Sequence, residues 1–162
     1  MSRLESFLRR LAAQRDCLEA AAHLVARVTG PVFELGLGNG RTYDHLRQLL
    51  PDREIFVFER EVAAHPDCVP DPAHLILGDI RATLPWAGPR IGPAALAHLD
   101  LGTGDAIASA AFAAVCGSLL VPHLRPGAIV VGDQEMAVAA WRPLALPAGV
   151  GAGRYFMWRV EA

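Results

Sequence analysis

Short apolar segments alternate with longer segments of helical periodicity along most of this 162-residue chain. The apolar segments are residues 32–35, 54–58, 74–77, 94–101 and 128–131. Segments that are apolar on both faces are typical of parallel strands buried beneath helices. The alternation therefore predicts an open, doubly wound α/β fold, in which helices cover both faces of a mostly parallel sheet in three layers.

The two ends of the chain add to this pattern. Residues 1–28 carry the apolar stripe of an amphipathic helix, which a Gly-Pro pair ends. Residues 141–160 contain two apolar runs around a loop, which predicts a closing antiparallel hairpin. A chain of this length is expected to form one domain. We assign residues 1–29 to a helix packed on that domain and residues 30–162 to the domain proper.

The composition argues against several classes of protein. A hydrophobic share of 52% against 20% charged residues excludes a disordered chain. The apolar runs fall short of the ~20 residues that cross a bilayer, so no membrane association is expected. The net charge of −2 gives no basic field for nucleic acid. The three cysteines lack the spacing of a disulfide framework or a zinc site, and the absence of a signal-peptide pattern favours a cytoplasmic location.

A turn with Gly36, Gly38 and Gly40 follows the first predicted strand and precedes a helix. Glycines let a ligand approach the backbone closely, although many α/β proteins have such a turn for structural reasons alone. The spacing does not fit the G-x-G-x-x-G pattern of dinucleotide-binding proteins, and the GK[ST] of a P-loop is absent. Glu34, two residues before the turn, would repel a pyrophosphate and favour a cationic ligand; capping of the following helix is its alternative role.

Acids also lie at or just past the ends of the other predicted strands. Glu59 lies 19 residues after Gly40, where an acid can bind both hydroxyls of a ribose; a solvent-exposed acid is the alternative. Asp79, Asp100 and Asp133 follow the next three strands. Ligands of open α/β sheets bind at these strand ends. The pattern therefore predicts an adenosine-type nucleoside that carries a positive charge and no phosphate.

The motifs ELGLGNG at residues 34–40, Glu59, the pair Gly78-Asp79 and LRPGAIVV at residues 124–131 together resemble the class I S-adenosylmethionine-dependent methyltransferases. The resemblance covers about residues 30–160, and the order of the motifs is its most specific feature. It implies a seven-stranded sheet with an antiparallel last strand, S-adenosylmethionine as the cofactor, and methyl transfer as the activity.

The resemblance also implies where the cofactor lies. The glycine turn and Glu34 would face its methionyl part, Glu59 its ribose, and Asp79 its adenine amino group. Tyr43 is placed to close over the cofactor or simply to pack. The predicted cofactor-binding residues are Glu34, Gly36, Gly38, Asn39, Gly40, Thr42, Tyr43, Glu59, Asp79, Ile80 and Asp100.

Methyl transfer depends mainly on alignment and needs a base only where the acceptor atom is protonated. The candidate catalytic residues are Asp100, Asp133 and His98. His98 and Asp100 are two residues apart on a strand and share a face, with Asp100 nearer the carboxyl end. The alternatives are a core histidine with satisfied hydrogen bonds for His98 and a turn-forming aspartate for Asp133.

No motif for a nucleic-acid or protein substrate is present, so we expect a small-molecule acceptor. Only the N-terminal helix, a loop at residues 86–92 and residues 141–153 could close a pocket, and a homodimer partner could contribute to it. Asp100, Asp133 and Gln134 resemble the positions that hold a divalent cation in metal-dependent O-methyltransferases. Glutamine replaces the usual residue there, and we assign no metal. A non-catalytic cofactor-binding module and a nicotinamide-dependent enzyme stay open as alternatives.

Overall fold

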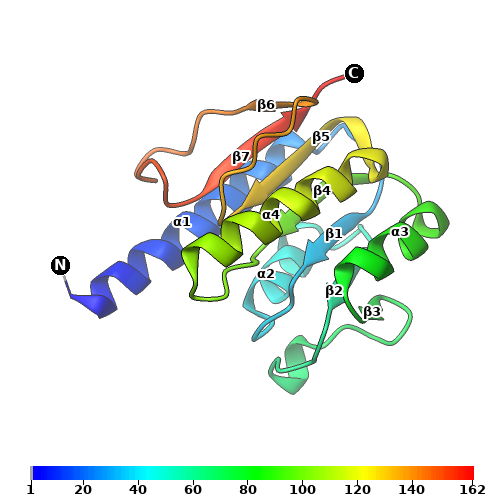
Figure 1. Ribbon diagram of the computed structural model, residues 1–162, viewed down its shortest axis with the longest axis horizontal. Coiled ribbons are helices and arrows are strands. Elements are labelled where there is room, and N and C mark those ends of the chain that lie inside the picture. Colours follow the sequence, from blue (N-terminus) through cyan, green and yellow to red (C-terminus); the bar gives the residue numbers. More distant parts are fainter. Residues whose placement is uncertain (1) are drawn as a thin grey trace.

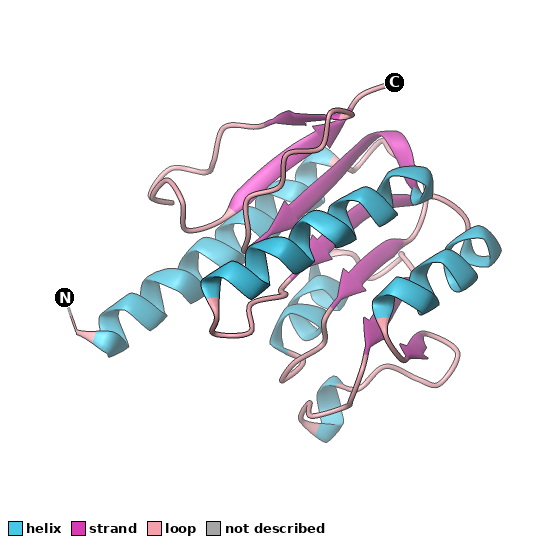
Figure 2. Ribbon diagram, in the orientation of Figure 1, coloured by secondary structure: helices cyan, strands magenta, loops and turns pink. Residues whose placement is uncertain are grey.

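The computed structural model describes residues 2–162, which form one seven-stranded sheet with helices on both faces (Figure 1). Figure 2 shows the same view coloured by secondary structure. The helices are α1 (Arg3–Leu24), α2 (Arg41–Leu49), α3 (Ile80–Ile91) and α4 (Ala106–Leu120), with 3-10 helices η1 (Pro66–Cys68) and η2 (Val121–His123). The strands are β1 (Val32–Leu35), β2 (Ile55–Glu59), β3 (Leu75–Leu77), β4 (Ala94–Leu99), β5 (Leu124–Gly132), β6 (Trp141–Pro143) and β7 (Phe156–Val160).

The strand order in the sheet is β3-β2-β1-β4-β5-β7-β6. Strands β1 to β5 pair in parallel, whereas β7 runs antiparallel to β5 and β6 antiparallel to β7. The order changes direction at β1, which has β2 on one side and β4 on the other. In such sheets a ligand binds beyond the strand ends at this switch point. The predicted fold class is therefore confirmed, including the antiparallel strands at the end of the chain.

Two apolar cores cover the two faces of the sheet. On one face, residues of α1 and α2 such as Leu18 and Leu46 pack against Val32. On the other face, residues of α3 and α4 such as Leu84 and Leu120 pack against Phe33. Figure 1 shows α3 and α4 in front of the strands and α1 and α2 behind them. Neighbouring residues of β1 point to opposite faces, as the pleat requires, and both faces are buried.

The expected loop at residues 86–92 is wrong, because α3 continues to Ile91. The helix contains Pro85 and Pro89, and proline in a helix interior costs roughly 3 kcal/mol. Leu84 and Ala87 are nevertheless buried on the same helix. Burial of this face outweighs the local cost of the prolines, so that this segment packs on the sheet and does not cover the strand ends.

Other elements differ from prediction at their boundaries. Helix α1 ends at Leu24, and β5 begins at Leu124, before the apolar run expected at residues 128–131. The pairing of β4 with β5 shifts register between Ala94 and Leu96, and Gly127 in this region has φ of +82°. A glycine with positive φ accommodates such an irregularity, which lets the strand start earlier than its apolar run.

Only the second half of α1 packs in the core. Its buried residues begin at Ala13, whereas Leu4, Phe7 and Leu8 are exposed by 68%, 44% and 56%. The first turns are instead stabilised at the cap, where the Ser2 side chain accepts the N–H of Glu5 at 3.1 Å. The helix therefore extends past the sheet at the end where the parallel strands finish (Figure 1).

Helix α4 is unusually apolar. Residues 106–123 have a mean hydropathy of 1.7, so that length and composition alone would let this segment cross a membrane. A third of the segment is buried inside the protein, and Ala113, Cys116 and Leu120 belong to the core that covers the sheet. Core helices of soluble proteins can have the same length and apolar composition, so these two properties alone do not identify a membrane-spanning helix.

The packing of α3 predicts a contrast between two of its residues. Truncation of Leu84, which is fully buried, should lower the free energy of unfolding by about 2–5 kcal/mol. Truncation of Trp86, which is 58% exposed on the same helix, should cost much less. Urea unfolding of Leu84→Ala and Trp86→Ala measures both values. Equal losses in the two variants would contradict the proposed packing.

Candidate active site

The glycine turn between β1 and α2 has the backbone that the sequence pattern indicates. Gly36, Gly38 and Gly40 have φ of +93°, +52° and +84°. A Cβ on Gly36 would lie 2.7 Å from the Asp100 carbonyl oxygen, and one on Gly40 would lie 2.5 Å from Cys68 Cβ. A Cβ on Gly38 would meet no atom within 4 Å. The outer glycines thus allow close packing, whereas Gly38 faces open space that a ligand can occupy.

A first cleft of about 130 Å³ lies between this turn and the first half of α1. Its walls come from α1, from the glycine turn with the start of α2, and from the end of β4. The lining residues are Phe7, Arg10, Leu11, Gln14, Gly36, Leu37, Gly38, Asn39, Arg41, Thr42 and Asp100. Five of the eleven predicted cofactor-binding residues therefore lie together in this cleft: Gly36, Gly38, Asn39, Thr42 and Asp100. The sequence indicated the N-terminal helix as closing material but did not identify its four lining residues.

A second cleft, of about 300 Å³, lies next to the first. Arg10 lines both clefts. The other lining residues are Gly102, Gly104, Asp105, Ala106, Ser109, Asp133, Gln134, Gly153 and Arg154. They come from the residues that follow β4 and β5, from the start of α4, and from the segment before β7. Asp133 therefore lies in this second cleft, separate from the glycine turn.

Glu34 does not lie at the opening of the turn, where the sequence interpretation placed it. Its side chain is fully buried and lines neither cleft. One carboxylate oxygen accepts the hydroxyl proton of Thr42, and the other lies 2.7 Å from Nδ1 of His98. The parallel register pairs Glu34 with His98 across β1 and β4, so both side chains point to the same face. Glu34 thus supports the cleft from beneath through Thr42.

His98 is also fully buried, so the structure does not bring it into either cleft as a catalytic residue. Its Nδ1 donates to Glu34, and its Nε2 is hydrogen-bonded to the hydroxyl of Tyr155. This is the satisfied core histidine that the sequence left as the alternative. Burial by itself lowers the pKa of His98, but the Glu34 carboxylate outweighs it and raises the pKa above its ordinary value.

The hydrogen bonds continue from Tyr155 to the first cleft. Gln14 on α1 donates to the Tyr155 hydroxyl at 3.1 Å and to Oδ2 of Asp100 at 3.1 Å. Arg10 donates to Oδ1 of the same carboxylate at 2.7 Å. Burial raises the pKa of Tyr155 well above its ordinary value, so the phenol stays protonated. We name the connected residues Thr42, Glu34, His98, Tyr155, Gln14 and Asp100 the buried network. No residue motif pointed to Gln14 or Tyr155, because their partners are far away in the sequence.

Glu59 lies at the end of β2 beside the glycine turn. Its Oε2 accepts the backbone N–H of Leu37 at 2.7 Å and of Gly38 at 3.0 Å. Its Oε1 accepts those of Arg60 at 2.6 Å and Glu61 at 3.3 Å. Burial raises the pKa of this carboxyl, but the four N–H groups together outweigh burial and lower it. Glu59 therefore holds the turn in place, and its contact with the ribose stays a prediction from the resemblance.

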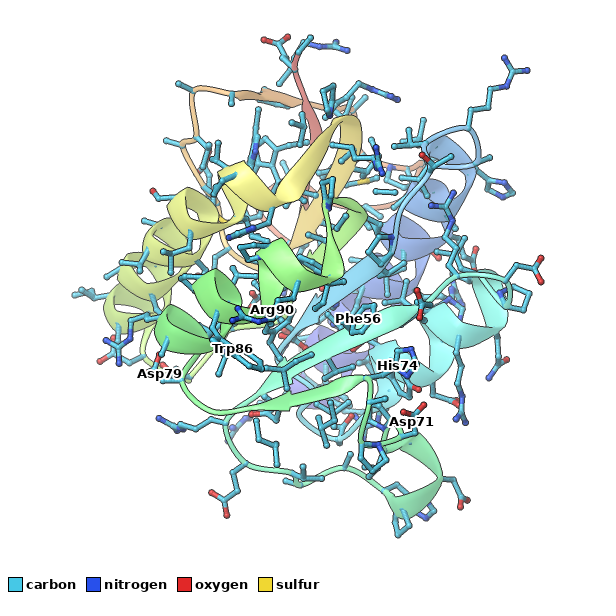
Figure 3. All side chains as sticks on the ribbon, turned by 90° about the vertical axis from the view of Figure 1, so that its right-hand side faces the viewer. Phe56, Asp71, His74, Asp79, Trp86 and Arg90 are labelled. Atoms are coloured by element: carbon cyan, nitrogen blue, oxygen red, sulfur yellow. The ribbon has the colours of Figure 1, made fainter. Side chains whose placement is uncertain are left out.

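Asp79 and Ile80 begin α3 at the end of β3. The Asp79 carboxylate caps the helix by accepting the N–H of Arg81 at 2.9 Å, and it forms an ion pair with the same residue. The Arg81 side chain and backbone lower the pKa of Asp79 to about 2. Figure 3 labels Asp79 at the start of α3, with Trp86 and Arg90 farther along the same helix. Asp79 thus stays charged and partly exposed, with its carboxylate directed to Arg81, and it lines neither cleft.

Tyr43 lies outside both clefts, so it does not close over them. It lines a groove at the opposite side of α2, together with Arg47, Asp71 and His74. The Arg47 guanidinium lies 5.7 Å from the centre of the Tyr43 ring. Adjacent helix residues point about 100° apart, since a turn holds 3.6 residues, so Thr42 faces the cleft and Tyr43 does not. Asp71 and His74 lie beside Phe56, away from Asp79 (Figure 3).

Asp100, Asp133 and Gln134 are the three residues that resemble a metal-binding set. The carboxylate oxygens of both aspartates accept hydrogen bonds from the protein. Asp100 contacts Arg10 and Gln14. Asp133 accepts the N–H of Leu101 at 3.1 Å and the amide of Gln134 at 2.9 Å. Within residues 2–162, no three or more His, Cys, Asp or Glu residues are grouped so that they could hold a metal ion.

The fold and the glycine turn define a class I methyltransferase. A family model described as S-adenosyl-L-methionine methyltransferase matches residues 1–160, so the chain belongs to this family. A crystal structure of an S-adenosyl-L-methionine methyl transferase from Silicibacter pomeroyi DSS-3 is 48% identical, covers 99% of both chains and superposes with a TM-score of 0.94. Among curated proteins, a search finds no match.

More distant structures show the same fold. NSun6 from Pyrococcus horikoshii with SFG is 14% identical, with a TM-score of 0.58 over 90% of this chain and 51% of its own. The plantazolicin methyltransferase BpumL, in complex with a pentazolic desmethylPZN analog and SAH, is 17% identical, with a TM-score of 0.52 over 80% of this chain and 48% of its own. The chain is thus an S-adenosylmethionine-dependent methyltransferase, and the predicted cofactor is confirmed. The open space at Gly38 leaves room for that cofactor, and the first cleft offers an acid, Asp100, and two arginines, Arg10 and Arg41, to the zwitterionic amino-acid end of its methionyl part.

The buried network predicts the effect of removing one hydroxyl. Tyr155→Phe leaves His98 Nε2 and one Gln14 N–H without their partner in a buried place. We expect the free energy of unfolding to fall by about 1–3 kcal/mol and the affinity for S-adenosylhomocysteine to weaken as Gln14 and Asp100 shift. Urea unfolding and calorimetric titration measure the two effects. Tyr43→Phe is the matched control and should change neither value. If Tyr155→Phe has the same stability and the same affinity as Tyr43→Phe, the role of Tyr155 in the buried network is contradicted.

Glu59 predicts a dependence on pH. Its pKa is lowered in the folded protein, so its stabilising contribution is present above its ordinary value of 4.5 and is lost as the pH falls through the lowered value. In Glu59→Gln an amide replaces one accepting oxygen, and that part of the acid-induced loss of stability should disappear. We also expect at least tenfold weaker binding of S-adenosylhomocysteine at neutral pH. The free energy of unfolding is measured for both proteins from about pH 3 to 7. The same slope against pH in both proteins would contradict this assignment.

Proposed function

We propose that this methyltransferase transfers the methyl group to a small molecule that binds in the second cleft. The observation that supports the proposal is the pair of adjacent clefts, which share Arg10 beyond the ends of β4 and β5. A cleft of about 300 Å³ is within the range of small-molecule sites. The net charge of −2 does not favour a nucleic-acid acceptor.

In this proposal the side chains of the first cleft bind the cofactor, and those of the second cleft bind the acceptor. When bound, S-adenosylmethionine supplies a methyl group on a positively charged sulfur, and an acceptor atom takes it by in-line displacement. Asp100 lies in the first cleft, where Arg10 and Gln14 donate to its two carboxylate oxygens and so hold α1 over the glycine turn. Asp133 lies in the second cleft and keeps free lone pairs beside Leu101 N and Gln134. It is our candidate to accept a proton from an acceptor hydroxyl or ammonium.

Alignment is the main contribution that such a site can make. Arg10, between the clefts, is fixed by its contact of 2.7 Å with Asp100. The buried network fixes Asp100 in turn through Gln14. Holding two ligands in one relative orientation can contribute up to ~7–11 kcal/mol to lowering a barrier in favourable cases.

Ligand-induced stabilisation tests the cofactor and the reaction class. A ligand at about 100 times its Kd should add about 2.7 kcal/mol to the free energy of unfolding. We expect thermal stabilisation by S-adenosylmethionine and by S-adenosylhomocysteine and none by NAD. Stabilisation by NAD alone would contradict the assignment. Turnover of radiolabelled methyl groups with a panel of metabolites, with and without Mg²⁺, then separates an enzyme from a non-catalytic cofactor-binding protein.

Three further sequence predictions stay proposals: the cytoplasmic location, a homodimer, and the division at residues 29 and 30. The apolar outer face of α4, where Ile107 is 85% and Val115 is 44% exposed, supports an association between copies. Light scattering coupled to gel filtration would report the mass in solution directly.

A further inference from the structure

The second cleft contains both signs of charge, and the acids in it are already bonded. Asp105 caps α4 by accepting the N–H groups of Ile107 at 2.9 Å and Ala108 at 3.0 Å. Both oxygens of Asp133 accept N–H groups of the protein. The negative charges of this cleft are therefore stabilised without any ligand.

The positive charge of Arg154, in the same cleft, is not paired with a carboxylate. Its only side-chain partner within residues 2–162 is Ser6 Oγ at 3.3 Å, and no carboxylate lies within ion-pair distance. A guanidinium has five N–H donors in a planar fork that matches the two oxygens of a carboxylate or phosphate. By contrast Arg10, the other guanidinium of the cleft, is paired with Asp100 at 2.7 Å. The unused donors of Arg154 are thus available to an anionic group.

The position of Arg154 is well defined by its neighbours in the chain. Tyr155, the next residue, is fully buried and belongs to the buried network. The backbone N–H of Arg154 donates to the carbonyl of Gly151 at 3.2 Å, and Gly153 has φ of +74°, which turns the segment before β7. Figure 1 shows this segment, between β6 and β7, beside α1. The backbone of Arg154 is therefore anchored beside the buried Tyr155, and its exposed side chain lines the cleft.

We propose that the methyl acceptor carries an oxyanion, either a carboxylate or a phosphate, which Arg154 binds at the edge of the second cleft. Arg154 and Asp133 both line this cleft, so an acceptor held by its anionic end reaches the proton-accepting carboxylate with another polar group. Arg154 is then a specificity-determining residue that excludes neutral analogues. This inference rests on the proposed function of the second cleft as the acceptor site.

The test uses small probes that carry only the anionic group of the proposed acceptor, so the identity of the whole acceptor is not needed. Acetate, acetamide and inorganic phosphate are titrated into the protein saturated with S-adenosylhomocysteine, and the Nε–H resonance of Arg154 is followed by NMR. We expect a saturable shift with acetate or phosphate and none with acetamide, which has the shape of acetate without its charge. The stronger of the two anions identifies the class of acceptor. Equal responses to acetate and acetamide, or no saturable response to either anion, would overturn the proposal.

Two variants locate the effect. Arg154→Gln should bind the anions at least tenfold more weakly, as followed by the amide resonances of Gly153 and Gln134. Arg142→Gln is the control, because Arg142 is an exposed arginine at the other end of the sheet, 3.6 Å from Glu161, and it should respond like the wild type. Equal weakening in both variants, or none in Arg154→Gln, would show nonspecific anion binding and overturn the proposal. The titration with S-adenosylhomocysteine is a separate readout: its failure would overturn the methyltransferase site, whatever the anions do.

Discussion

The arrangement of the clefts depends on one buried pair of polar side chains, Glu34 and His98. A carboxylate taken out of water costs several kcal/mol unless charged or hydrogen-bonding partners replace the lost hydration. Here each oxygen of Glu34 has a partner, and both nitrogens of His98 have one. The pair is therefore tolerated only with its neighbours in place, and those neighbours extend to Asp100 at the cleft. The interior of the sheet thereby determines the geometry of the surface where ligands bind.

The same hydrogen bonds join elements that are distant in the sequence. Gln14 lies on the first helix, His98 on a central strand, and Tyr155 just before the last strand in the chain. A two-residue contact between such elements costs loop-closure entropy, which the apolar cores on both faces must already have offset. The polar contacts then select one arrangement among several compact ones. Glu59 has a similar role on a local scale, because it holds four backbone N–H groups around the glycine turn.

Much of this could be predicted from the sequence where the signal is local. Apolar runs identified the strands, and glycine spacing identified the turn that lines the first cleft, because both follow from short-range sterics and burial. The depth of Glu34 could not be predicted, since a strand residue faces one side or the other according to register, and its partner is 64 residues away. The sequence also left open whether Tyr43 faces the cofactor or packs, because one helical position decides which side of α2 a side chain occupies. The loop expected at residues 86–92 is a helix, because long-range burial of Leu84 outweighs the local cost of Pro85 and Pro89.

The overhang of α1 has a practical consequence for handling the protein. Phe7 lines the first cleft, so Ser2 lies only about a turn and a half of helix from bound ligand. The last strand runs antiparallel to β5, so the carboxyl end of the chain lies at the opposite end of the strands, where the parallel strands begin. An affinity tag or fluorophore fused ahead of Ser2 would crowd the entrance and distort binding measurements, whereas one fused after Ala162 would stay clear of it.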